Sequence, residues 1–346
     1  MMMKINDDLL RQIESDLSLN APFVKGRVNP VRNCWHFYTN GNAVDTLFHD
    51  RDDFIDGMNR VFVVYEKHNV IILAFCLMDT HVHFVLYGDF DECNKFMHDY
   101  MSLTSNRIAR RHSERHKLRK IAISHQAIED ELYLKFVICY VLKNAPVGGL
   151  GYTSYDYPWG SGSLYFRDTG KWCAPIWSLF KLAGHLEAAG LLDATAFLDA
   201  TGHNITFLDK LGAREKRIFL NTRTTGFACN ALIIDGMIFP GEYVATEIVE
   251  RIFKTHKSFN YFMCRTKEED IEKIEGTLSH LTIPIQELRQ HRDEICLELF
   301  AVDNIRKLTP QQRLQLVRTI KSRVDCSTKQ ICKTCGLIFA EVKDLI

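Results

Sequence analysis

The pattern of apolar and polar positions divides the first half of the chain into short strands and longer helices. Residues 33–39 are rich in aromatic side chains and run into the turn-forming residues 40–42, which indicates a strand and its end. Apolar residues then recur at helical spacing from residue 50 onwards, and residues 70–78 form a continuous apolar run of strand length. Residues 81–87 form a further predicted strand, which we expect to pair antiparallel with that run.

The same patterning continues through the next segments. A helix that begins near residue 90 is predicted to continue through residues 106–120, and a short strand follows at residues 121–124. A third helix is predicted over residues 129–144, because Pro146 and the glycines after it end a helix. The resulting order, β-α-β-β-α-β-α, is typical of a small antiparallel sheet with helices packed on it, which is an α+β domain.

The second half of the chain shows no comparable alternation of strands and helices. Residues 156–170 are rich in Gly, Ser and other turn-forming residues, so we expect the first domain to end there. The segment after them is mostly helical in pattern, with a hairpin expected near residues 233–239. The predicted divisions of the chain are residues 1–165 for the α+β domain, residues 171–300 for a helical accessory region, and residues 305–346 for a C-terminal segment.

Composition limits the class of protein. The 346 residues suffice for about two domains, and 46% hydrophobic with 25% charged residues is the composition of a folded chain. The formal net charge of +0 excludes a uniformly basic polyelectrolyte, and no apolar run reaches the roughly 18 residues of a membrane span. The 11 cysteines are scattered singly, and the N-terminal residues lack the basic-then-apolar layout of a signal peptide. We therefore expect reduced thiols and a cytoplasmic location.

Two histidines in the predicted strand at residues 81–87 are the first candidates for chemistry. His81 and His83 are separated by one residue, so both imidazoles project from the same face of a strand. Two neutral imidazoles on one face form half of a divalent metal site and need one or two further ligands. The alternative is a pair of polar side chains that are hydrogen-bonded on a half-exposed strand, an interpretation that the tripeptide by itself favours.

The end of the helix at residues 129–144 carries a second group of polar residues. Tyr140 and Asn144 are four positions apart and share a helix face, with Lys143 beside them. The phenol is a candidate nucleophile, the amide oxygen a candidate third metal ligand, and the ammonium a candidate partner for phosphate charge. Alternatively, Tyr140 is a core residue and Asn144 only ends the helix before Pro146, which are the commoner roles of these residue types.

A cluster of basic residues lies at the end of the long helix that begins near residue 90. Residues 106–120 hold seven Lys and Arg residues and a single acidic residue, Glu114. A solvated helix face usually interleaves Glu with Lys, whereas uninterrupted positive charge is typical of a site for a polyanion, most commonly nucleic acid. An ordinary solvent-facing helix stays open as the alternative. The candidate DNA-binding residues here are Arg107, Arg110, Arg111, Arg115, Lys117, Arg119 and Lys120.

The C-terminal segment has the pattern of a helix-turn-helix. Thr309 as N-cap and Pro310 as the first helical residue predict a helix there. Farther along, residues 327–331 predict a short helix, Gly336 a turn, and residues 339–346 a second helix. Any two-helix end of a helical domain has the same pattern. The candidate DNA-binding residues are Lys329, Gln330 and Lys343.

Four short motifs, taken together, resemble those of the HUH single-tyrosine transposases, particularly the REP-associated, IS200-like group. Residues 36–42 resemble a strand that ends in His-x-x-x-x-Gly-Asn, and residues 78–83 resemble a strand with Met-x-x-His-hydrophobic-His. Residues 140–147 resemble the family's helix end, Tyr-hydrophobic-x-x-Asn-Pro-Val, and residues 157–161 resemble Tyr-x-Trp-Ser-Ser. The motifs occur in the family's order and cover about residues 30–165.

The resemblance implies a fold and a reaction. The fold is a ferredoxin-like HUH nuclease domain, followed here by a mainly α-helical C-terminal region. The resemblance implies that His81, His83 and Asn144 hold Mg²⁺ or Mn²⁺. It implies that Tyr140 attacks a DNA phosphate, giving a 5′-phosphotyrosine link and a free 3′-hydroxyl, while Lys143 steadies the phosphate charge. The implied substrate is single-stranded or hairpin DNA, bound by a monomer or a homodimer.

The sequence also departs from the family pattern and leaves alternatives open. Ala145 is inserted before Pro146, and Asn40 stands where the family often has Arg. The nearest alternative function is a catalytically silent, domesticated protein that binds a specific DNA sequence. A metal-dependent hydrolase would need a further series of acidic or His ligands, and the C-terminal cysteines lack a convincing fourth ligand for zinc. The middle region, residues 171–300, carries no chemical motif, so a helical interaction module stays open as an alternative for it.

Overall fold

The computed structural model divides the chain into two compact units. The first comprises residues 1–146 with 151–266, and the second comprises residues 147–150 with 267–346. The predicted domain limits at residues 165, 171, 300 and 305 stay predictions. The structure describes residues 5–22, 28–39, 46–113, 121–147, 152–166, 204–223, 226–227, 230–266, 285–302, 305–324, 326, 328–337, 342 and 345.

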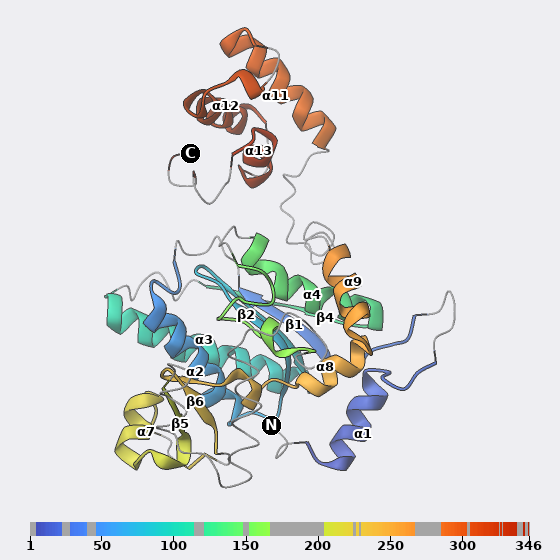
Figure 1. The fold of residues 1–346 in the computed structure, drawn as a ribbon, viewed down its shortest axis with the longest axis vertical. Coiled ribbons are helices and arrows are strands. Elements are labelled where there is room, and N and C mark those ends of the chain that lie inside the picture. The colour runs from blue at the N-terminus through green and yellow to red at the C-terminus, as the bar shows by residue number, and fades with distance from the viewer. Residues whose placement is uncertain are drawn as a thin grey trace. The chain divides into compact units, whose positions relative to one another are not determined.

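A four-stranded sheet lies at the centre of the first unit (Figure 1). Its strand order is β2-β3-β1-β4, and every neighbouring pair is antiparallel. The strands are β1 (Cys34–Thr39), β2 (Ile71–Leu77), β3 (Val82–Tyr87) and β4 (Ile123–Ala127). The predicted α+β class and the antiparallel pairing of β2 with β3 are confirmed, and β4 begins slightly later than the sequence pattern predicts.

Helices cover both faces of this sheet (Figure 1). Neighbouring residues of a strand point to opposite faces, and in β3 this separates Phe84 from His83. The Phe84 ring centroid lies 5.1 Å from that of Tyr100 on one face, and the His83 ring centroid lies 5.5 Å from that of Tyr140 on the other. The helices around these strands are α1 (Asp7–Asp16), α2 (Arg51–Tyr65), α3 (Phe90–His112) and α4 (Glu131–Val147).

The ends of α3 and α4 can be compared with the sequence prediction. Helix α3 ends at His112, because Ser113 adopts a left-handed conformation with φ of 60° that closes the helix. The predicted helix is therefore confirmed as far as His112, and residues 114–120 of its predicted continuation lie outside the described residues. Helix α4 continues through Pro146 to Val147, so the predicted end at Asn144 is wrong. Proline fits the helical φ but has no N–H, so it removes the hydrogen bond to the carbonyl four residues earlier; at position 146 this falls one residue before the helix ends.

The outer edge of β2 is covered by two later segments of the chain. The Leu77 backbone N–H donates to the Trp159 carbonyl at 2.8 Å, and the Ala245 N–H donates to the Ile72 carbonyl at 2.8 Å. An uncovered edge strand exposes unpaired backbone groups that invite association with other chains. These segments therefore complete the sheet, although both lie far beyond its last strand in the sequence.

A second, smaller sheet belongs to the same unit. Its order is β5-β6-β7, and the predicted hairpin near residues 233–239 is confirmed as β6 and β7. Asp235 and Gly236 have φ of 47° and 81°, the two positive values that a tight hairpin turn requires. The elements of this region are β5 (Ile205–Phe207), α7 (Ala213–Phe219), β6 (Leu232–Ile234), β7 (Met237–Ile238), α8 (Thr246–Phe253) and α9 (His256–Arg265).

Polar side chains of α2 attach this second sheet to the first unit's core. The Asn59 amide donates to the Gly236 carbonyl at 3.0 Å and accepts from the Ile238 N–H at 2.7 Å. The neighbouring Arg60 guanidinium, which is also buried, donates to the Asn221 carbonyl at 3.2 Å. Because the amide of Asn59 satisfies a donor and an acceptor of the same hairpin, it fixes the position of that hairpin.

Replacing Asn59 by alanine is expected to lower the free energy of unfolding of this unit by about 2–4 kcal/mol. The reason is that two backbone groups of the hairpin lose their partners, at about 1–3 kcal/mol for each buried group. Asn106→Ala, at an exposed position of α3, is the matched control with the same change in helix propensity. Urea unfolding followed by tryptophan fluorescence measures the effect, because all 4 tryptophans precede residue 178. Equal stability of the two variants would contradict this account of the attachment.

The second unit is a helical bundle around a small core. Its helices are α11 (Ile285–Phe300), α12 (Pro310–Arg323) and α13 (Thr328–Thr334). The predicted start of α12 is confirmed, since the Thr309 hydroxyl accepts from the Gln312 N–H and the Gln312 side chain accepts from the Thr309 N–H. The predicted turn at Gly336 has φ of 70°, whereas most of the predicted second helix at residues 339–346 lies outside the described residues. No helix within the described ranges is long and apolar enough to cross a membrane.

Candidate functional site

Helix α4 brings Tyr140 onto the same sheet face as the two predicted histidines. His83 lies in β3 and His81 directly precedes that strand, and their ring centroids are 5.0 Å apart. The Tyr140 ring stands almost perpendicular to the His83 ring, at an interplanar angle of 86°. Tyr140 and His83 are both buried, so the site lies at the contact between α4 and the sheet.

Asn144 lies in the same site, one helical turn after Tyr140. Its side-chain oxygen Oδ1 is 3.5 Å from His81 Nε2. The amide nitrogen donates to the carbonyls of Tyr140 and Val141 at 3.1 and 3.3 Å, which fixes the orientation of the amide with its oxygen towards His81. Ala145 is buried within α4 and follows Asn144, so its insertion leaves the spacing of Tyr140 and Asn144 unchanged.

Neighbouring side chains hold both histidine rings at their Nδ1 atoms. The Thr80 hydroxyl lies 2.8 Å from His81 Nδ1, and Nε2 of His36 in β1 lies 3.0 Å from His83 Nδ1. The sequence motif included His36 but gave it no role. Its alternation with Trp35 and Phe37 in a strand places it on one face, whereas its pairing with His83 depends on β1 lying beside β3.

The surroundings of His83 favour the neutral form of its imidazole. Burial, together with the neighbouring His81 and His36 rings, holds the pKa of His83 well below its ordinary value. Neutral imidazole is the form that binds a metal ion. The amide oxygen suits either Mg²⁺ or Mn²⁺, and the two imidazole nitrogens favour Mn²⁺ and later ions of the first transition row over Mg²⁺, which prefers oxygen ligands. The donor set therefore fits a divalent ion of the first transition row.

The ammonium group of Lys143 is hydrogen-bonded to a backbone carbonyl. It donates to the carbonyl of Thr266 at 2.7 Å, at the residue that follows α9. Cations stabilise helix C-termini by pairing with the carbonyls left there. In this structure Lys143 therefore ties α4 to the end of α9, and its predicted contact with phosphate stays a prediction.

The predicted DNA-binding residues of α3 differ in whether carboxylates of the protein already neutralise their positive charge. Arg110 is exposed, and Arg107 lies 3.6 Å from the Asp56 carboxylate. Arg111 contacts three carboxylates at the N-terminus of α2, with N–O distances of 2.6–3.2 Å. Most of the positive charge of Arg111 is thus compensated within the protein. The remaining predicted residues of this cluster, Arg115, Lys117, Arg119 and Lys120, lie outside the described residues.

The carboxylates that hold Arg111 belong to a second cluster of metal-ligand type. Ligand atoms of Asp50, Asp53 and His112 all lie within 4.8 Å of one another. Asp53 is buried and already paired, since its two oxygens contact Arg111 Nη1 at 2.6 Å and His112 Nε2 at 2.7 Å. A metal ion would have to displace the guanidinium of Arg111 from this cluster. We therefore regard it as an ion-pair network that joins α2 to the end of α3.

In the C-terminal unit, Gln330 is the predicted DNA-binding residue whose side chain the structure describes. Its amide oxygen accepts from the Cys326 thiol at 2.8 Å. Cys332 and Cys335 are buried in the core of the bundle, and burial raises the pKa of the Cys335 thiol to about 12. Among the described residues these thiols form no cluster of metal-ligand type. The side chain of Lys329 and the whole of Lys343 lie outside the described residues.

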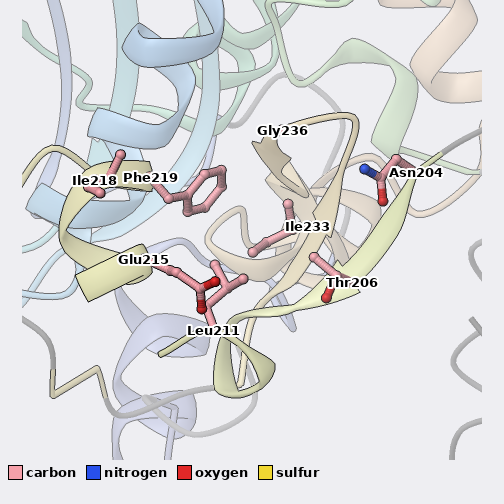
Figure 2. A pocket seen from close by; sticks show the side chains of 8 residues that line it. All are labelled: Asn204, Thr206, Leu211, Glu215, Ile218, Phe219, Ile233 and Gly236. Carbon is pink, nitrogen blue, oxygen red and sulfur yellow. The ribbon is translucent and has the colours of Figure 1, made fainter. Parts of the chain in front are cut away.

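A cavity of about 410 Å³ lies elsewhere in the first unit, between α7 and the small sheet (Figure 2). Glu215 is the ionisable side chain among its described lining residues, and its carboxylate accepts from the Gly212 N–H at 2.6 Å. The rest of the lining is apolar or carries amide and hydroxyl groups. This cavity holds none of the histidine, tyrosine or basic residues that the sequence singled out.

Comparisons with known proteins give one weak similarity of fold. A solved structure of a REP-associated tyrosine transposase bound to a REP hairpin is similar over 44% of this chain and 90% of that chain. The two share 16% sequence identity, and the TM-score is 0.31. No family model matches the sequence, and no curated protein matches it. At this degree of similarity, the function has to be inferred from the geometry of the site itself.

Proposed function

We propose that the chain is a transposase-like DNA endonuclease and strand transferase that cleaves single-stranded DNA with Tyr140 as nucleophile. The observation that carries the proposal is the convergence of Tyr140, His81, His83 and Asn144, from two separate segments of the chain, on one face of the sheet. A phenol beside two imidazoles and an amide oxygen supplies both a nucleophile and the ligands of a metal ion. Simple core packing of Tyr140 requires no such neighbours.

The proposed reaction exchanges one phosphate ester for another. The Oη oxygen of Tyr140 attacks the scissile phosphorus, and the bond from phosphorus to the 3′ oxygen breaks. The phenol gives up its proton and the 3′ oxygen gains one, which leaves a 5′-phosphotyrosine and a 3′-hydroxyl. Attack of a 3′-hydroxyl on the phosphotyrosine reverses this step, so a strand is rejoined without an external source of energy.

The side chains around Tyr140 prepare the site for this exchange. A divalent cation held by His81, His83 and Asn144 would polarise the phosphate and offset its charge in the transition state. The helix carbonyls fix the Asn144 amide, and the Thr80 hydroxyl fixes the His81 ring, so these ligands need little reorganisation. The sheet and α4 support the site with buried, regular elements.

Basic residues at the end of α3 and residues of the C-terminal segment would bind the DNA. The proposed phosphate contacts on α3 come from Arg107 and Arg110, since Arg111 is committed to the carboxylates of α2. Binding through several such contacts weakens steeply with salt. Four further basic residues complete this proposed surface: Arg115, Lys117, Arg119 and Lys120. The proposed target-recognition residues of the C-terminal segment are Lys329, Gln330 and Lys343.

Binding without cleavage is the second candidate function. The observation that favours it is the contact of the Lys143 ammonium with the Thr266 carbonyl, which withdraws a cation from the neighbourhood of Tyr140. A domesticated protein of this kind would keep sequence-specific DNA binding and lose the covalent step. The two functions therefore differ in whether a bond to Tyr140 forms.

A covalent-adduct assay with Mn²⁺ tests the proposal. Hairpin oligonucleotides with single-stranded flanks are incubated with the full chain and resolved on a denaturing gel. Because the tyrosine becomes linked to the 5′ phosphate, we expect a slow protein–DNA band from 3′-labelled strands and a shortened free fragment from 5′-labelled strands. Chelation of the metal is expected to remove both.

Each other outcome of the assay has a definite meaning. A slow band from 5′-labelled strands would show the opposite polarity of attachment and contradict the proposed chemistry. A mobility shift on a native gel without any covalent band, over the whole pool of hairpins, would support the silent DNA-binding protein instead.

A further inference from the structure

The two candidate metal-binding histidines are held in the same way by different neighbours. His81 Nδ1 lies 2.8 Å from the Thr80 hydroxyl, which leaves His81 Nε2 facing Asn144 Oδ1. His83 Nδ1 lies 3.0 Å from Nε2 of His36. Both His36 and His83 are buried, and their rings are nearly parallel, with an interplanar angle of 16°. His36 is thus the partner of Nδ1 in His83, as the Thr80 hydroxyl is the partner of Nδ1 in His81.

A hydrogen bond between two neutral imidazoles requires one nitrogen to donate and the other to accept. If His83 Nδ1 donates, its Nε2 carries the lone pair and is ready to bind a metal ion. If His83 Nδ1 accepts, the proton sits on Nε2, and that nitrogen cannot be a ligand. The direction of this one hydrogen bond therefore decides which atom of His83 is available.

We propose that His36 is a positioning residue that accepts a hydrogen bond from His83 Nδ1 and thereby keeps His83 Nε2 free as the metal-binding atom. Among the described residues, His36 is the side chain that hydrogen-bonds to His83 Nδ1. Partners at the second nitrogen of a ligating histidine fix its tautomer and its ring orientation. The functional consequence rests on the proposed metal site, whereas the tautomer of His83 does not.

The position of His36 in the sheet explains how it performs this role. Its register partner in β3 is Val85, and His83 is the partner of Tyr38, so His36 reaches His83 diagonally across the two strands. Side chains in such diagonal positions are still within reach of one another when they are long or aromatic. His36 is fully buried, so water does not compete for the same nitrogen.

Two variants at this position separate the hydrogen bond from the packing. His36→Gln retains an acceptor, because the glutamine Oε1 takes approximately the place of the imidazole Nε2. His36→Leu retains apolar bulk and removes the acceptor. The first readout is the tautomer of His83 in the metal-free protein, measured by ¹⁵N NMR on histidine-labelled chain and assigned with a His83→Gln variant. We expect a proton on His83 Nδ1 in the wild type and in His36→Gln, and a shift of that proton to Nε2 in His36→Leu.

The second readout is the affinity for Mn²⁺ alone, measured by electron paramagnetic resonance. Loss of such an outer partner typically lowers metal affinity by about 10- to 100-fold, so we expect this loss in His36→Leu and affinity near that of the wild type in His36→Gln. A proton on His83 Nε2 in the wild-type protein would overturn the inference, whatever the variants do. Equal Mn²⁺ affinity of the wild type and His36→Leu would also overturn the positioning role. If the wild type binds no Mn²⁺, the proposed metal site fails, and the NMR result still decides the tautomer.

Discussion

Tyr140→Phe is expected to reduce the covalent protein–DNA adduct by at least about 1,000-fold, because it removes the only atom that forms the new phosphate ester. The phenylalanine ring retains the contacts of the Tyr140 ring with His83 and His36, whose centroids lie 5.5 and 5.8 Å away. Folding and DNA binding are therefore expected to persist. The adduct is quantified from 3′-labelled hairpins on a denaturing gel, and binding is measured in parallel on a native gel.

Tyr155→Phe is the matched control for this substitution. Tyr155 also loses a hydroxyl in a partly buried place, where it donates to the Asn260 side chain at 2.6 Å, but it lies outside the proposed site. We expect the control to form the adduct at close to the wild-type level. An undiminished adduct in Tyr140→Phe would mean that another residue is the nucleophile. Loss of the adduct in both variants would point to a general effect of hydroxyl removal on folding.

The local geometry of the site was predictable from the sequence, because it depends on short spacings. The two-residue period of a strand places His81 and His83 on one face, and the helical period places Tyr140 above Asn144. The resemblance of both motifs to one family then predicts that the two segments form a single site. The structure places His81 Nε2 3.5 Å from Asn144 Oδ1, and the role of these atoms as metal ligands stays a prediction.

Contacts between distant segments were not predictable in the same way. His36 contacts His83 only because β1 is the neighbour of β3 in the sheet, and strand order is not encoded in any short spacing. Arg111 was counted as free positive charge, whereas acids at the start of α2 compensate it. A count of charges within residues 106–120 cannot include carboxylates that arrive from another helix.

The same limit applies to the second sheet and to the helix ends. The pattern predicted the hairpin of β6 and β7 from its turn, but it gave no sign that the amide of Asn59 would hold this hairpin against α2. Helix α3 ends at His112, where Ser113 adopts a left-handed conformation, and Arg111 and His112 in its last turn contact the Asp53 carboxylate of α2, which no local pattern reveals. Periodicity describes each element and not its contacts with other elements.

The double variant His81→Ala/His83→Ala is expected to lower the affinity for Mn²⁺ by more than about 100-fold, because both nitrogen ligands of the proposed site are removed and not merely an outer partner. The matched control is Asp50→Ala in the other cluster of metal-ligand type, which includes Asp53 and His112. Since the Arg111 guanidinium already lies 2.7 Å from the Asp50 carboxylate, we expect this control to leave the Mn²⁺ affinity unchanged.

Calorimetric titration of the metal-free protein with Mn²⁺ separates the two clusters without reference to any DNA substrate. The single variant His81→Ala, at a partly buried position before β3, shows whether a loss in the double variant arises from ligand removal or from a disturbed core, because His83 is buried and His81 is less so. Weakened binding in Asp50→Ala with intact binding in the histidine variants would place the metal in the acidic cluster. There the guanidinium of Arg111 now supplies the positive charge, with its Nη1 2.6 Å from Asp53 Oδ1. The proposed chemistry would then lack an ion beside Tyr140, since the ligands of that ion would come from α2 and the end of α3 and no longer from the sheet face that α4 covers.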